Sequence, residues 1–153
     1  MIRLPRKTMF ALEAVVDIAY NARPEPVQSK EITRRQGIPQ RYLEQVMQHL
    51  VHAGVLKGVR GPRGGYTLAR ERRRITVGEV VRVIDAIDRE NDPELEADSA
   101  GSELGQQVVR PLCNELQEEM MQRLEAVTLE DLCQRARDAG IRPEARERPD
   151  FTI

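Results

Sequence analysis

The side chains best suited to molecular recognition lie along one predicted helix in the first half of the chain. Residues 40–53 place apolar side chains at helical spacing, and the opposite side carries Gln40, Arg41, Glu44 and Gln45. Amide, guanidinium and carboxylate groups can donate and accept hydrogen bonds in fixed directions. The pattern therefore predicts a helix with one face for burial and one face for binding a polar partner.

Two arginines follow this helix at a predicted hairpin. Arg60 and Arg63 lie in the glycine- and proline-rich run 60–65, between strand-forming residues at 55–56 and 66–68. A polar helix beside such a hairpin suits a nucleic-acid duplex, because the helix can enter a major groove while arginines reach phosphates or a narrow minor groove. The alternative is an ordinary small domain whose surface charges are solvated.

The preceding residues supply the elements that would position these groups. Residues 8–21 carry an apolar helical stripe, and Ser29 is a suitable N-cap for a short helix over 30–36. A turn at 37–39 then completes a helix-turn-helix arrangement, to which the hairpin adds a wing. The predicted fold is mainly α with a small β-hairpin, and residues 1–75 form a winged helix-turn-helix region.

A connecting helix and a loop are predicted next. Residues 76–90 form a helix that is capped by Thr76 and ends near Asp88. Residues 91–105 are rich in acidic and small polar side chains, which predicts a mobile acidic loop.

The last part of the chain resumes helical spacing. Residues 106–139 predict a long helix, with Pro111 in its first turn, and a short C-terminal helix. The long helix has an apolar stripe and would dimerise the protein, which lets two units grip two half-sites of DNA. The alternative is a helix that packs only within its own subunit. Residues 140–153 predict a disordered tail.

The charge is distributed unevenly between the two halves of the 153-residue chain. Residues 1–75 contain 15 Lys and Arg against 6 Asp and Glu, whereas residues 76–153 contain 9 against 19. A basic first half indicates a polyanionic partner. In the alternative interpretation, the two halves neutralise each other through ion pairs.

Several other classes of protein are not supported by the composition. The chain has no apolar run long enough for a membrane span and no signal-peptide pattern at its start, so we expect no membrane partner and a cytoplasmic location. A catalytic Ser/His/Asp set, a phosphate-binding loop and zinc-ligand spacing are absent, so we expect no enzyme. His49 and His52 are interpreted as surface or core histidines.

The motifs taken together resemble one family of regulators. GIPQRYLEQVMQHLVHAGVL, VRGPRGGY, ITVGEVVRVIDAID and VTLEDL occur in this order, and the sequence over about residues 2–135 resembles the Rrf2 family of transcription regulators. Its members include an iron-sulfur cluster regulator and several repressors. The resemblance implies a homodimeric winged helix-turn-helix protein that binds imperfect palindromes in double-stranded DNA.

The resemblance also implies roles for particular residues. Polar residues early in the second helix of the motif contact bases, and the wing arginine enters the minor groove. These positions correspond to Gln40, Arg41, Glu44, Gln45 and Arg60. A carboxylate can accept from a cytosine amino group, an amide can pair with adenine, and arginine can bind guanine or phosphate.

Three further residues are candidate phosphate contacts. They are Lys30, Tyr42 and Arg63.

The cysteines depart from the pattern of the family's cluster sensors. Those sensors bind a cluster through cysteines in the loop before the long helix and at its start, but residues 91–109 contain neither Cys nor His. Gln107 and Arg110 occupy the positions expected for the last ligands. We therefore expect no cofactor of the conventional three-cysteine kind.

The signal that the protein senses has more than one interpretation. Cys113 could be a redox-sensitive thiol, a ligand of an unusual cluster or a structural cysteine. The protein could instead respond to a protein partner or a small-molecule effector. A winged-helix module that binds acidic protein is the competing functional class.

Overall fold

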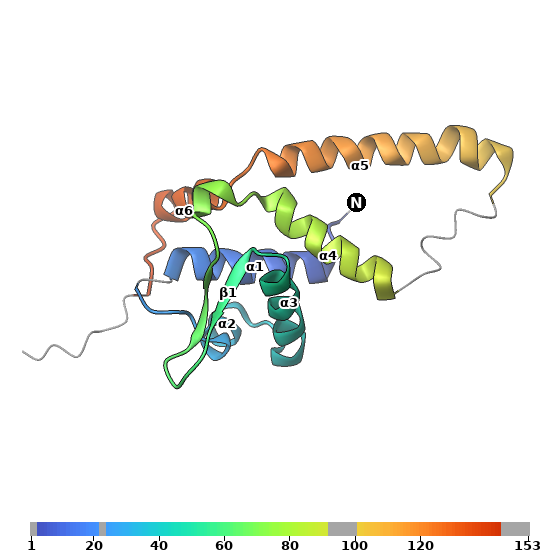
Figure 1. Cartoon of the computed structure of the whole chain (residues 1–153). Helices are drawn as coiled ribbons and strands as arrows, with labels where there is room; N and C mark the ends of the chain where they lie inside the picture. The colour runs from blue at the N-terminus through green and yellow to red at the C-terminus, as the bar shows by residue number, and fades with distance from the viewer. Residues whose placement is uncertain (1–2, 22–23, 92–100, 145–153) are drawn as a thin grey trace, which may run out of the picture.

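Helix α1 (Arg6–Asn21) lies at the centre of the core, and the other α-helices, except the long one near the C-terminal end, pack against it (Figure 1). The computed structural model describes residues 3–21, 24–91 and 101–144. Ala14, Val15 and Ile18 are fully buried, which confirms the apolar stripe predicted for the first helix. The helix begins two residues before the predicted start, directly after Pro5, a residue that is tolerated at a helix N-terminus.

Helices α2 (Ser29–Gln36) and α3 (Gln40–His52) form the helix-turn-helix. Gly37 ends α2 with φ of 66°, a left-handed conformation that glycine adopts without steric cost. Leu43 and Met47 of α3 are buried against the core, and the opposite face of the helix is exposed. The second helix of the motif is therefore amphipathic, as predicted.

The N-cap predicted for α2 is wrong by one position. Gln28 is the N-cap residue, and its backbone N–H donates to the carboxylate of Glu31 at 3.0 Å. Ser29 is the first helical residue, and its hydroxyl oxygen accepts from the side-chain amide of Gln40 at 3.3 Å. Ser29 therefore joins α2 to α3 instead of capping α2.

The wing is a hairpin of β1 (Leu56–Val59) and β2 (Gly65–Leu68), paired antiparallel. Val27 pairs with the hairpin through an isolated antiparallel bridge, in which its N–H donates to the carbonyl of Tyr66 at 2.9 Å and its carbonyl accepts from Tyr66 N–H at 2.7 Å. The residues just before α2 are thus joined to the wing, which stabilises a hairpin that would be marginal alone.

A short 3-10 helix, η1 (Arg72–Arg74), leads from the wing to helix α4 (Val77–Asn91). Thr76 caps α4 as predicted, since its hydroxyl accepts from Glu79 N–H at 3.1 Å. The helix continues three residues past the predicted end at Asp88. Most of the predicted acidic loop, residues 92–100, lies outside the described part of the chain.

The last helices extend along one edge of the molecule (Figure 1). A π-helical turn, η3 (Gly105–Val109), continues directly into α5 (Arg110–Glu125), and α6 (Leu129–Asp138) follows. Within the described residues, α5 has no buried side chain, and no helix is long and apolar enough to span a membrane. Helix α5 projects from the body as an arm.

The arm is attached to the body at a narrow joint. Thr76 and Thr128 form an isolated antiparallel bridge between the starts of α4 and α6. At Gly78, an added Cβ would lie 2.9 Å from the backbone nitrogen of Glu125, so only glycine permits this approach of α4 to the end of α5. The bridge and the close approach together set the direction of α5.

The segment after α6 docks on α1. Tyr20 donates its hydroxyl to the carbonyl of Ile141, and the N–H of Glu144 donates to the side-chain oxygen of Asn21 at 2.9 Å. The predicted tail at 140–153 thus begins with residues that have defined contacts, and its residues 145–153 lie outside the described part of the chain.

Candidate nucleic-acid interface

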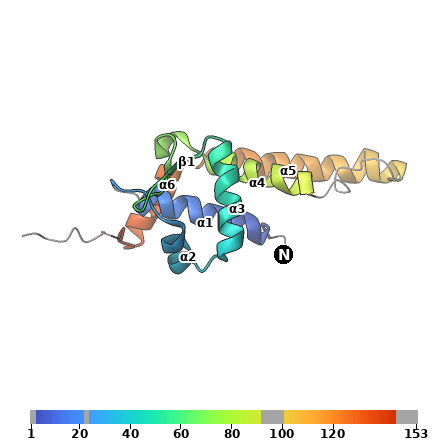
Figure 2. The same cartoon turned by 60° about the horizontal axis from the view of Figure 1, so that its bottom comes forward.

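The exposed face of α3 carries the polar groups predicted to bind a partner. Arg41, Glu44 and Gln45 are exposed, and Gln40 is half-buried at the start of the helix. Figure 2 shows α3 in front of the molecule, with α2 beside it and α5 behind. The fold therefore leaves this face open to solvent.

The side chain of Gln40 connects the two helices of the motif. Its Oε1 accepts from the hydroxyl of Thr33 at 3.0 Å, and its Nε2 donates to Ser29. Nε2 also donates to Oε1 of Glu44 at 3.0 Å. Gln40 thus orients the Glu44 carboxylate on the outer face, where the remaining lone pairs can accept from a partner.

Tyr42 makes packing contacts in the described structure. Its hydroxyl donates to the carbonyl of Lys7 at 2.7 Å, and its ring centroid lies 5.8 Å from that of Phe10. Burial, followed by the charge of Asp88, raises the pKa of Tyr42 to about 12. The phenol is therefore neutral at physiological pH, and its contact with phosphate stays a prediction.

The turn of the wing explains why its sequence is so rich in glycine. Gly61 has φ of 111°, which side chains rarely adopt. At Gly64 an added Cβ would lie 2.9 Å from the carbonyl carbon of Arg60, and at Gly65 it would lie 2.6 Å from that of Val27. This turn holds Arg60 and Arg63 exposed at the tip.

The basic residues divide into two groups by their pairing. Three arginines that follow the wing are paired with carboxylates, namely Arg70 with Glu79, Arg72 with Glu130 and Arg73 with Glu71. In contrast, four basic groups on the recognition elements have no ion pair with a carboxylate among the described residues: Lys30 of α2, Arg41 of α3, and Arg60 and Arg63 of the wing tip. The other two basic groups of α2, Arg34 and Arg35, are paired with Glu144 and Asp17. Ion pairs between the two halves thus neutralise part of the positive charge, because Glu79, Glu130 and Glu144 of the second half pair with Arg70, Arg72 and Arg34. The unpaired positive charge gathers on one side.

Sequence reasoning missed a buried ion pair beneath α2. The guanidinium of Arg35 donates to both carboxylate oxygens of Asp17, at 2.9 Å and 2.7 Å, and the Asp17 side chain is fully buried. Gln36 donates to the same carboxylate at 2.8 Å. The sequence contains a signal for this ion pair, because Asp17 lies within the apolar stripe of α1 and a buried carboxylate requires a partner.

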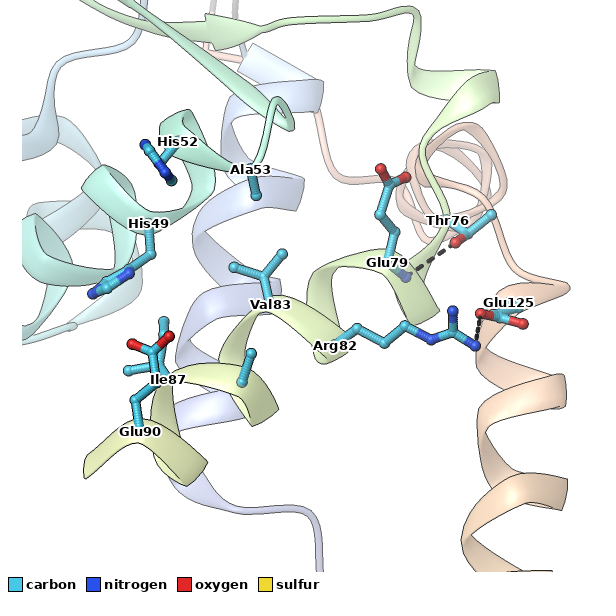
Figure 3. A pocket seen from close by; sticks show the side chains of 11 residues that line it. His49, His52, Ala53, Thr76, Glu79, Arg82, Val83, Ile87, Glu90 and Glu125 are labelled. Carbon is cyan, nitrogen blue, oxygen red and sulfur yellow. Dashed lines mark hydrogen bonds and ion pairs between the residues drawn. The ribbon is translucent and has the colours of Figure 1, made fainter. Parts of the chain in front are cut away.

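A hollow of about 670 Å³ lies between the end of α3 and the outer face of α4 (Figure 3). Val83 and Ile87 provide apolar surface, and the exposed His49 and His52 lie on the α3 side. A small-molecule effector has room here, and its binding stays a prediction.

The two cysteines do not fit a conventional iron-sulfur centre. Cys113 is exposed on α5, whereas Cys133 is fully buried, and burial raises the pKa of its thiol. Within the described stretches, no three His, Cys, Asp or Glu side chains converge as a metal site. With two cysteines in the sequence, the chain has fewer thiolates than the three that such a cluster would require, and operation without a cluster stays a prediction.

The three-helix core, the wing and the separate long helix define a winged-helix transcription regulator. A model of the Rrf2 family, described as an iron-dependent transcriptional regulator, matches residues 4–135. The chain belongs to the Rrf2 family.

Individual relatives agree with this assignment. Over 84 residues the chain is 42% identical to the HTH-type transcriptional regulator IscR of Escherichia coli O1:K1, and the match covers 55% of this chain and 52% of that protein. The structure of T. potens IscR is 31% identical, with a TM-score of 0.73 and 90% of both chains covered. That of CymR, the global cysteine regulator of B. subtilis, is 27% identical, with a TM-score of 0.68 and coverage of 88% of this chain and 98% of that one.

Proposed function

We propose that the protein is a sequence-specific DNA-binding transcription regulator that binds an imperfect palindrome as a homodimer. The observation that carries this proposal is the gathering of unpaired basic groups and exposed hydrogen-bonding side chains on α2, α3 and the wing tip. These elements lie on the same side of the molecule, away from α5 (Figures 1 and 2). A cytoplasmic location is part of the same proposal.

In this proposal, α3 enters a major groove and the wing reaches the neighbouring minor groove. Glu44, oriented by Gln40, accepts from a cytosine amino group, and Gln45 pairs with adenine. Arg41 binds guanine or phosphate, and Arg60 enters the minor groove, where the negative potential attracts arginine.

Other basic groups contact the DNA backbone. Lys30 on α2 and Arg63 on the wing flank α3 and contribute phosphate contacts. These contacts add affinity without sequence information.

The exposed apolar stripe supports the homodimer. Leucine, valine and methionine recur at every fourth position from the residue before η3 through α5, and their exposed fractions lie between 43% and 69%: Leu104, Val108, Leu112, Leu116 and Met120. A stripe of this length on one subunit's arm is suited to cover the same stripe of a second copy. Two winged units can then bind half-sites about one helical turn apart.

The regulator works without a conventional three-cysteine cluster, and Cys113 is the thiol that is accessible to oxidants. Anaerobic purification followed by a visible spectrum and iron analysis tests this part. A colourless, iron-free protein that binds DNA supports it. A chromophore that disappears in Cys113→Ser would show a cluster with unusual ligands.

Salt-dependent binding separates DNA recognition from a winged-helix module that binds acidic protein. Binding to random-sequence duplex DNA is measured by fluorescence anisotropy at several salt concentrations. Each phosphate contact adds about 0.9 to the slope of log affinity against log salt, so Arg60→Ala should lower both affinity and slope. Arg73→Ala is the matched control, because it removes the same charge from a residue that is paired with Glu71 outside the proposed interface.

Base recognition needs a selected binding sequence. With a duplex recovered by selection from a random pool, Glu44→Ala should cost about 1–3 kcal/mol for that sequence and little for random DNA. Failure of the wild-type protein to bind any duplex at low salt would overturn the proposed function.

A further inference from the structure

The carboxylate of Glu144 lies between two guanidinium groups of α2. Arg34 donates from Nη2 to both carboxylate oxygens, at 3.0 Å and 3.3 Å. Arg35 donates from Nη1 to one of them at 2.7 Å. Two converging guanidinium groups around one anion form an arrangement that accepts a phosphate as readily as a carboxylate.

One half of this anion site is built into the core. Arg35 is 13% exposed, and its Nε and Nη2 are occupied by the fully buried carboxylate of Asp17. The guanidinium is therefore held in one orientation, with Nη1 directed toward Glu144. Because Asp17 already neutralises Arg35, the positive charge that Glu144 balances is that of Arg34.

The site lies beside the proposed DNA contacts of α2. Arg34 follows Lys30 by one helical turn, so both side chains start from the same face, and both are exposed. This face is opposite Ile32, which is fully buried in the core. The first helix of a helix-turn-helix crosses the DNA backbone, so this outer face of α2 is the one that phosphates approach.

The carboxylate is held in place by contacts that a competitor can break. Hydrogen bonds from Arg35 and then Arg34 lower the pKa of Glu144, so the group is charged at neutral pH. The Arg34 side chain is 64% exposed and that of Glu144 is 45% exposed. Ion pairs this exposed contribute little free energy, which makes Glu144 displaceable.

We propose that Arg34 and Arg35 form a binding site for a DNA backbone phosphate, which Glu144 fills in the free protein. The C-terminal segment then acts as an internal competitor of DNA, and its release accompanies binding. This inference rests on the proposed DNA-binding function.

A double-mutant cycle on the full-length protein tests the site. Affinity for random-sequence duplex DNA is measured at several salt concentrations for wild type, Glu144→Gln, Arg34→Gln and the double variant. Glu144→Gln should bind about two- to five-fold more tightly, the size of one exposed ion pair. Its salt slope should be unchanged or steeper, by up to about one phosphate contact.

The Arg34→Gln background distinguishes local competition from a general change in charge. In that background the Glu144→Gln effect should largely disappear, because the remaining guanidinium, that of Arg35, is already neutralised by Asp17. Glu118→Gln is the matched control, since it removes one exposed carboxylate from α5 and should bind as wild type does.

Release of the segment can also be observed directly. The N–H of Glu144 is bonded to Asn21 in the free protein, so its hydrogen exchange should accelerate when duplex DNA is added.

The outcomes separate the two proposals. If wild type binds DNA but Glu144→Gln has no effect, or has an equal effect in the Arg34→Gln background, the phosphate site is wrong and the proposed function stands. If wild type binds no DNA, both are wrong.

Discussion

Gly64 and Gly65 occupy positions in the wing where no side chain fits. A Cβ at Gly65 would lie 2.6 Å from the carbonyl carbon of Val27, the residue that joins the wing to the start of α2. The Gly-Gly pair in the turn is therefore required for close backbone approach, and not only for the bend itself.

Substitution of Gly65 by alanine should separate the wing from Val27. We expect Gly65→Ala to reduce the free energy of unfolding by about 1–3 kcal/mol, as overpacking does, and to weaken DNA binding. The measurement is urea denaturation followed by circular dichroism. Gly58→Ala, in the opposite strand, is the control, because a Cβ there meets nothing within 4 Å. Equal stability of the two variants would contradict this account of the wing.

At the scale of the element, α6 begins with a capping box formed by Thr128 and Asp131. Thr128 also forms the bridge with Thr76 that joins α6 to the start of α4. The hydroxyl of Thr128 accepts from Asp131 N–H at 3.1 Å, and the Asp131 carboxylate accepts from Thr128 N–H at 2.9 Å. Hydrogen bonds from the backbone and then the side chain of Thr128 lower the pKa of Asp131. The charged carboxylate therefore stabilises the start of α6.

The effect of this cap should depend on pH. Because the pKa of Asp131 is lower in the folded state than its ordinary value of 3.8, its stabilisation is present above pH 3.8 and is lost as pH falls through the folded value. Asp131→Ala should therefore lower the melting temperature at neutral pH, and the difference from wild type should shrink in acid. Asp138→Ala is the control, since a carboxylate at the end of α6 gains nothing from the helix dipole. A difference that is constant with pH would contradict the role of the charged cap.

At the scale of the whole molecule, the arm projects from the body with its apolar stripe uncovered. The bridge of Thr76 with Thr128 and the close contact at Gly78 set its direction. In a dimer formed through α5, this joint would determine the distance between the two winged units. The proposed half-site spacing thus depends on residues that lie far from the DNA-binding face.

A charge within the stripe should dissociate the proposed dimer. We expect Leu116→Glu to convert the protein to monomers in sedimentation experiments and to weaken binding to a palindromic duplex on the order of a hundredfold, because the second half-site is no longer tethered. Asn114→Glu introduces the same charge about half a turn away on the same helix and should remain dimeric. A wild-type protein that is monomeric at all concentrations would contradict the dimer itself.

Local patterns predicted the elements better than the contacts between them. The helical spacing of apolar residues in α3 and the helix cap at Thr76 depend only on residues close in sequence, and both predictions are confirmed. Ser29 was misassigned as a cap because its hydroxyl instead accepts from Gln40, which lies across the turn. Arg72 belongs to the basic first half of the sequence, but its charge is paired with Glu130, which is distant in sequence.

The sequence by itself determined the order of helices, the wing, the polar face of α3 and membership of the Rrf2 family, because these follow from short-range periodicity and motifs. Only the tertiary structure decided which charges stay unpaired, how Gln40 orients Glu44, and that Glu144 lies on Arg34 and Arg35. The physical reason is that an ion pair or hydrogen bond depends on distance in space, and folding places residues separated by more than a hundred positions within contact.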